Sequence, residues 1–148
     1  MTLDFDGIAV AIAGRYAAAQ LTAPAGYATI RSSTANPPGA IGPTPAVVVS
    51  ADQGDFDAGN GTRIGGQDWF VRFYLDQTSD LERTEPALRK WLNVLAYQHL
   101  SGVQLGGLVA TCRLMSWSIG VLSYGGLDYA GIEFSVHTTT SEGWAASV

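Results

Sequence analysis

The stretch DWFVRFYLDQTSDLERTEPALRKWLNVL, residues 68–95, contains two hydrophobic periods, one after the other. Along residues 68–77 every second side chain is apolar and the alternate ones are mixed, which predicts a β-strand with one face in the core. The apolar set is Trp69, Val71, Phe73 and Leu75, and the mixed set is Phe70, Arg72, Tyr74 and Asp76. The next apolar side chains recur at helical spacing, which predicts a helix with a buried face made of Leu81, Leu88, Trp91, Leu92, Leu95 and Leu100.

End signals for this helix lie in and around the same stretch. Ser79 or Thr84 is expected to cap its N-terminus, and Pro86 is expected in its first turn. Gly102 is expected to end it.

An earlier helix is predicted over residues 5–21, because apolar side chains recur there at intervals of three and four. Asp4 or Asp6 suits the positive end of its dipole.

Further strands are expected where β-branched and aromatic residues are dense, at residues 27–31, 46–51, 109–124 and 131–138. The last two form a hairpin, since GGLDYAG between them supplies glycines where a tight turn needs positive φ. Prolines make residues 35–45 a loop, and residues 52–67 are expected to form a second long loop. The C-terminal tail is placed at residues 139–148.

These elements predict a single α+β domain over residues 1–148. An antiparallel or mixed β-sheet would pack against two main α-helices, with long loops between elements. One domain is also what a chain of this length supports.

Charged residues make up only 14% of the chain, against about 25% in average soluble proteins. So few charges predict apolar surface that a partner covers, and a homo-oligomer is the first expectation. The net charge of −5 disfavours specific binding to nucleic acid, which requires clustered basic residues. Acidic residues near the N-terminus argue against a signal peptide, and no run is apolar enough for a membrane span, so an intracellular-type soluble chain is expected.

The segment DFDAGNGTRIGG, residues 55–66, begins like a calcium-binding loop. An EF-hand that starts at Asp55 would need an oxygen ligand, a glycine and a glutamate where Gly59, Asn60 and Gly66 stand. A flexible, solvated loop is therefore favoured over a metal site. A calcium-binding or small-ligand module built on residues 55–68 stays open as an alternative.

Catalytic chemistry is not expected. Neither His99 nor His137 has a recognisable partner, and neither GGLVATC nor GTRIGG matches a phosphate-binding loop. Cys112 is alone and is expected to pack in a strand. We therefore expect no catalytic residue, no cofactor and no resident metal, and a chain that is not an enzyme.

The order of elements resembles a tail terminator protein of long-tailed bacteriophages, of the kind found in siphoviruses of actinobacteria. The resemblance spans most of the chain. It rests on PAVVVSAD after the proline-rich loop, the polar stretch before WFVRFYLDQ, LRKWLNVL with LSGVQLGG behind it, and the closing GGLDYAGIEFSVHTTT. Its most suggestive piece is the pattern Y-x-G-I-x-F-x-V, formed by Tyr129, Gly131, Ile132, Phe134 and Val136.

The resemblance implies a structural virion protein of the tail and neck, assembled in the host cytoplasm. Such proteins form a hexameric ring on the last ring of the tail tube, stop its polymerisation and offer a surface to the head connector. The implied partners are further copies of the chain, the major tail tube protein and a head–tail connector or stopper protein, with no membrane involved. Genome DNA would pass through the ring without specific binding, which an acidic chain suits. Another neck component, such as a head–tail joining or stopper protein, is the alternative.

The long loops are expected to order on a neighbouring subunit or tube ring. The interface residues predicted on this basis are Asp55, Phe56, Asp57, Asn60, Arg63, Ile64 and Trp144.

Overall fold

The computed structural model describes residues 4–18, 21–59, 62–100 and 105–143. The side chains of residues 57–59, 62–64, 99, 100, 106 and 141–143 are outside this description. The order of elements is α1 (Phe5–Gly14), β1 (Ser32–Thr34), β2 (Ala46–Gly59), β3 (Thr62–Asp76), α2 (Leu81–Leu100), η1 (Leu105–Gly107), β4 (Thr111–Tyr124) and β5 (Leu127–Gly143).

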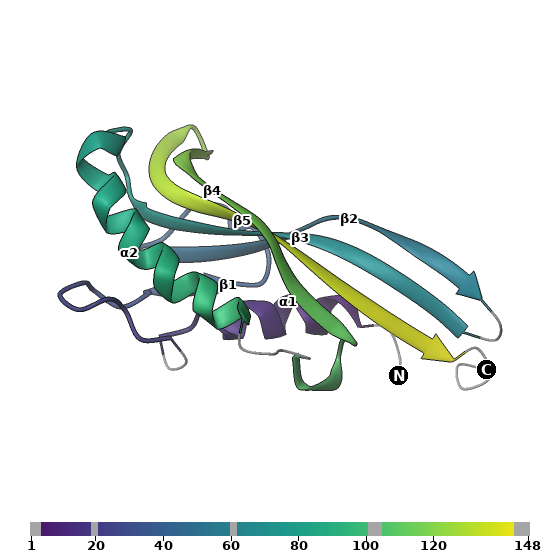
Figure 1. Cartoon of the computed structure of the whole chain (residues 1–148). Coiled ribbons are helices and arrows are strands. Elements are labelled where there is room, and N and C mark those ends of the chain that lie inside the picture. The colour runs from purple at the N-terminus through teal and green to yellow at the C-terminus, as the bar shows by residue number, and fades with distance from the viewer. Residues whose placement is uncertain (1–3, 19–20, 60–61, 101–104, 144–148) are drawn as a thin grey trace.

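The five strands form one mixed sheet in the order β1-β2-β3-β5-β4. Only β1 runs parallel to its neighbour, and the three other pairs are antiparallel. Both helices contribute to one buried cluster on a single face of the sheet, here called the helix face. The α+β single domain with a mixed sheet and two main helices is thereby confirmed (Figure 1).

The alternation seen in the sequence along β3 matches its burial. Trp69, Val71 and Phe73 are buried on the helix face, where Phe73 packs against Trp91 of α2 with ring centroids 4.8 Å apart. Tyr74 points to the opposite face, here called the outer face, and is buried there in a smaller cluster with Val48 and Tyr129. The outer face of the sheet, where the mixed side chains of β3 lie, therefore carries a second, smaller core.

The proline-rich loop at residues 35–45 supplies the cover for that second core. Ile41 packs against the cluster, and the Tyr124 hydroxyl donates a hydrogen bond to the carbonyl of Pro38. The loop was expected to order on a neighbouring chain. Within its own chain it packs against the sheet and covers apolar surface around Tyr74, and its contact with a neighbouring chain stays a prediction.

The first helix is shorter than predicted and ends at Gly14 rather than near residue 21. Its start is as expected, since the Asp4 carboxylate accepts a hydrogen bond of 2.8 Å from the Gly7 N–H. At its end, the Arg15 guanidinium donates to the carbonyl of Gln98, and the Gln98 side chain donates to the carbonyl of Arg15. These reciprocal bonds tie the chain at the end of α1 to α2.

The cap of α2 also differs from the prediction. The Asp80 carboxylate accepts a hydrogen bond from the Arg83 N–H at 3.2 Å, so neither Ser79 nor Thr84 is the capping residue. Pro86 lies inside the helix rather than in its first turn. The predicted end at Gly102 lies outside the described residues.

Three predictions, of one strand, one loop and the C-terminal tail, need correction. No strand covers residues 27–31; the short β1 begins after them, at Ser32, where it pairs with Ala46 just beyond Pro45. The loop expected at residues 52–67 is wrong, because β2 continues to Gly59 and β3 begins at Thr62. The tail predicted from residue 139 is also wrong up to residue 143, since that segment is the end of β5 and pairs with β3. In both places, backbone pairing on neighbouring strands replaces the loop that polar composition suggested.

Candidate functional site

A long β-structured arm projects beyond the helices. It consists of residues 52–59 of β2, 62–67 of β3 and 138–143 of β5, and Figure 1 shows it extending past the N-terminal end of α1. β3 is its central strand, because it pairs with β2 on one side and β5 on the other. A bulge between Ala51 and Gln53 marks the point where β2 enters the arm. Such bulges increase local twist and redirect a strand.

Two of the predicted interface residues, Asp55 and Phe56, lie on the β2 edge of the arm and are exposed. The backbones of Asp57, Arg63 and Ile64 lie in the same hairpin, where Asp57 pairs with Ile64, but their side chains are not described. Asn60 and Trp144 lie outside the described residues. The structure thus brings the central group together on one hairpin.

At the base of the arm, the helix face carries a buried chain of hydrogen bonds. The Trp69 indole donates to the Thr138 hydroxyl at 3.0 Å, and that hydroxyl donates to the side-chain oxygen Oε1 of Gln67 at 2.8 Å. The Gln67 amide then donates to the Thr140 hydroxyl at 3.1 Å. All four residues are buried, so the apolar core ends in a satisfied polar layer where the arm begins.

On the outer face, where the arm joins the body of the sheet, polar groups meet across neighbouring strands. Asp68 Oδ1 lies 2.7 Å from His137 Nδ1, and the Gly66 N–H donates to Asp55 Oδ1 at 3.1 Å. A Cβ atom at Gly66 would lie 2.9 Å from the His137 ring, so glycine leaves the space that the ring occupies. The pairing of Asp68 with His137 was not foreseen, because it depends on the β3–β5 register, which the sequence does not specify.

A hollow of about 350 Å³ lies between the start of α1 and the arm. Its apolar walls include Phe5, Phe56 and Trp69, and the Phe5 and Phe56 rings meet edge to face with centroids 6.4 Å apart. Phe56 is nevertheless 63% exposed. An aromatic pair that stays open to solvent beside a hollow is a surface suited to an apolar side chain from outside.

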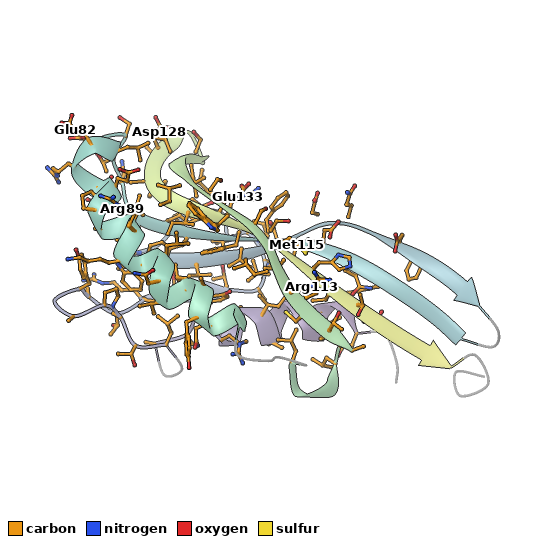
Figure 2. All side chains as sticks on the ribbon, in the orientation of Figure 1. Glu82, Arg89, Arg113, Met115, Asp128 and Glu133 are labelled. Atoms are coloured by element: carbon orange, nitrogen blue, oxygen red, sulfur yellow. The ribbon has the colours of Figure 1, made fainter. Side chains whose placement is uncertain are left out.

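The opposite edge of the sheet carries a second exposed group, on β4. Met115 and Trp117 are 55% and 54% exposed, and Arg113 is also exposed (Figure 2 labels Arg113 and Met115 on this strand). Met115 lies in a bulge, because the pairing with β5 shifts between Leu114 and Ser116. The sequence contained a signal for it, since the apolar positions that lie on the helix face change from even numbers (Cys112, Leu114) to odd numbers (Trp117, Ile119).

Burial shifts the pKa of two side chains that pack in or against the core, Cys112 and Tyr74. Burial raises the pKa of the Cys112 thiol, and the Arg15 guanidinium partly opposes that rise. The pKa of the Tyr74 hydroxyl is also raised by burial. Both groups are therefore stabilised in their neutral forms, which fits packing roles.

Within the described residues, no group of three or more His, Cys, Asp or Glu side chains is arranged to hold a metal ion. Neither described helix combines the length and apolar character needed to cross a lipid bilayer. What this part of the chain does present is apolar and charged surface at the two edges of one sheet. No protein-family model and no curated protein sequence matches the chain.

Proposed function

We propose that the chain is a structural virion protein that forms a ring at the head-proximal end of a phage tail tube. In this role it ends tube polymerisation and joins the tail to the head connector. The sequence resemblance supplies the class of protein, including its hexameric ring. The arm is the structural observation that supports it.

The arm supports an assembly role because it is regular secondary structure with little cover from its own chain. Its described β2 side chains from Asp52 to Phe56 are exposed, and they include an aromatic ring and two carboxylates. Edges of this kind are templates for another chain, and soluble monomers usually protect them. An arm that projects from a two-helix body can reach a neighbouring ring without disturbing the core.

The low charge content agrees with this role. A chain with 14% charged residues and exposed aromatic side chains at both sheet edges is suited to interfaces on more than one side. The acidic residues of the arm suit a lumen through which DNA passes without binding, since like charges repel.

The proposal is tested by adding the purified chain to polymerising tail-tube subunits of the same virion. We expect short tubes that carry a ring at one end in electron micrographs. Replacing Phe56 with serine should reduce capping at least tenfold, because the exposed ring of the arm is lost. Tyr97→Ser is the matched control, since Tyr97 is an aromatic residue on α2 that is 70% exposed, against 63% for Phe56.

Tubes that keep their length and carry no ring at either end would contradict the proposal. A chain that binds the head connector but leaves the tubes uncapped would support the alternative neck component, a head–tail joining or stopper protein.

The calcium-binding or small-ligand module on residues 55–68 is tested separately, because the hollow beside Phe56 lies in that segment. Saturable heat on addition of calcium in calorimetry would favour this module over the structural virion protein.

A further inference from the structure

Two long strand edges are unpaired within the described chain, and they lie on opposite sides of the sheet. β1 pairs with β2 only at residues 46–48, which leaves Val49–Gly59 of β2 without an outer neighbour among the described strands. β4 pairs with β5 along one side only, so its other side is the opposite edge of the sheet. Each edge presents a row of backbone N–H and C=O groups able to pair with another strand.

The directions of the two edges match for a head-to-tail contact. The pairs β2–β3, β3–β5 and β5–β4 are all antiparallel, so β2 and β4 run in opposite directions. Two copies in the same orientation, set side by side, would therefore bring β4 of one against β2 of the next as an antiparallel pair. A contact of this heterologous kind, repeated by rotation, closes into a ring.

The charges of the two edges are complementary. β4 carries Arg113 and no acidic residue, whereas the free part of β2 carries Asp52, Asp55 and Asp57 and no basic residue. Arg113 pairs with His137 on β5, and Asp55 pairs with Gly66 on β3, which places both Arg113 and Asp55 on the outer face of the sheet. In a continuous sheet these opposite charges would lie on the same side.

The apolar groups are also complementary and share the other face. Trp117 pairs with the buried Phe134, which places it on the helix face. The hollow beside Phe5 and Phe56 opens on that face too, because Phe5 belongs to α1 and the buried Trp69 lines it. An exposed indole on one edge therefore corresponds to an open aromatic hollow at the other.

From these matches we propose the subunit contact of the ring, an inference that rests on the proposed ring-forming function. The first half of β4 in one copy, from Thr111 to Trp117, adds as an antiparallel strand to Val49–Gly59 of β2 in the next copy. Arg113 then lies beside the acidic residues of that arm, and Trp117 packs at the Phe5–Phe56 hollow. The occupant of each free edge is thus a second copy of the same chain.

The test uses two variants, each altered at one edge only. The β4-edge variant carries Arg113→Glu and Trp117→Lys, which disable the β4 edge and leave the β2 edge intact. The β2-edge variant carries Asp52→Lys and Asp55→Lys, which disable the β2 edge and leave the β4 edge intact. In sedimentation velocity, the wild-type chain is expected to form oligomers, and each variant alone should sediment as a monomer. An equal mixture of the two should form dimers, because one intact β4 edge meets one intact β2 edge.

Two further variants act as controls. The chain that carries Arg113→Glu together with Asp52→Lys and Asp55→Lys has the charges of both edges reversed. The edges are again complementary, so this chain should recover assembly. Arg89→Glu with Tyr97→Lys makes equivalent changes on the exposed face of α2 and should assemble like the wild type. Far-ultraviolet circular dichroism and the thermal midpoint verify that every variant is folded.

Several outcomes would overturn the contact: a wild-type chain that stays monomeric at its highest soluble concentration, a mixture that yields no dimer, or a one-edge variant that still assembles alone. If the variant with Asp52→Lys and Asp55→Lys, whose β4 edge is intact, dimerises by itself, the edges pair symmetrically as β4 with β4 instead. Failure here is distinguishable from failure of the proposed function. If the one-edge variants cap tail tubes as well as the wild type, the proposed subunit contact is wrong and the proposed function stands. If rings form through these edges but never cap tubes, the subunit contact stands and the proposed function is wrong.

Discussion

Thr138 is the residue on which the junction between core and arm depends. Its buried hydroxyl accepts from the Trp69 indole and donates to Gln67, so one side chain satisfies two buried groups. A second threonine hydroxyl contact, between Thr111 on β4 and Thr139 on β5, is exposed, with 2.6 Å between the two oxygens. The two sites have the same chemistry and differ in their access to water.

Thr138→Val should therefore lower the free energy of unfolding by about 1–3 kcal/mol, because valine keeps the shape but leaves buried polar groups unpaired. Thr111→Val is the control, and it should cost no more than about 0.5 kcal/mol, since water replaces the lost partner. Urea denaturation measures both. Equal losses in the two variants would show that the buried chain of hydrogen bonds has no special role.

At the level of single residues, burial was largely predicted along the two hydrophobic periods, although Leu75, Leu81 and Leu92 are only partly buried. Trp69, Val71 and Phe73 on β3, and Leu88, Trp91 and Leu95 on α2, are all buried as expected. Pairings between distant residues were not predictable. Asp68 and His137 meet only because β3 and β5 adopt one particular register, and a sequence pattern of period two is compatible with several.

Among the elements, the turn between β4 and β5 shows how a local sequence signal specifies structure. Tyr124 pairs with Leu127, which leaves Gly125 and Gly126 as a two-residue turn with φ of +60° and +81°. Positive φ at both positions is what a tight hairpin of this twist requires. The expected glycine turn is confirmed, and β5 begins sooner after it than predicted.

Gly125→Val should destabilise the chain by about 1–2 kcal/mol, because a branched side chain is strained at positive φ. No atom lies within 4 Å of a Cβ built there, so the cost comes from the backbone alone. Gly125→Asn should be tolerated, since asparagine adopts this conformation more readily. The matched control is Gly120→Val in β4, where the added side chain also meets open space but φ is ordinary. If Gly120→Val costs as much as Gly125→Val, turn strain is not the cause.

The elements that were wrongly predicted share one physical reason. The arm strands from Asp52 to Gln67 contain glycines, carboxylates and few apolar residues, so they lack the alternation that identifies a half-buried strand. They are strands because β3 pairs on both of its sides, which is a property of the assembled sheet. Similarly, residues 35–45 were correctly predicted as a loop, but their packing against Tyr74 depends on a partial core that only the folded sheet creates.

The whole molecule divides into a body that contains its main core and an arm that contributes little to it. Among the side chains that the structure describes, the buried cluster on the helix face extends along β2 as far as Val49 and along β3 from Trp69 onward. Asp55 still pairs with Gly66 beyond that point, so the hairpin could be closed there without removing a member of this cluster. Stability and assembly should therefore be separable properties.

Replacing Phe56–Gly65 with Asn-Gly closes a shorter hairpin directly after the Asp55–Gly66 pair, since this dipeptide favours a two-residue turn. The shortened chain should remain folded, with a cooperative thermal transition within several degrees of the wild type, because the main cluster is intact. It should also sediment as a monomer and fail to cap tail tubes, because it lacks the Phe56 side of the hollow and the outer edge of the arm. A chain that unfolds would show that the arm belongs to the cooperative core, and one that still assembles would show that the contacts lie on the body. Folded monomers are the result that the division between body and arm requires.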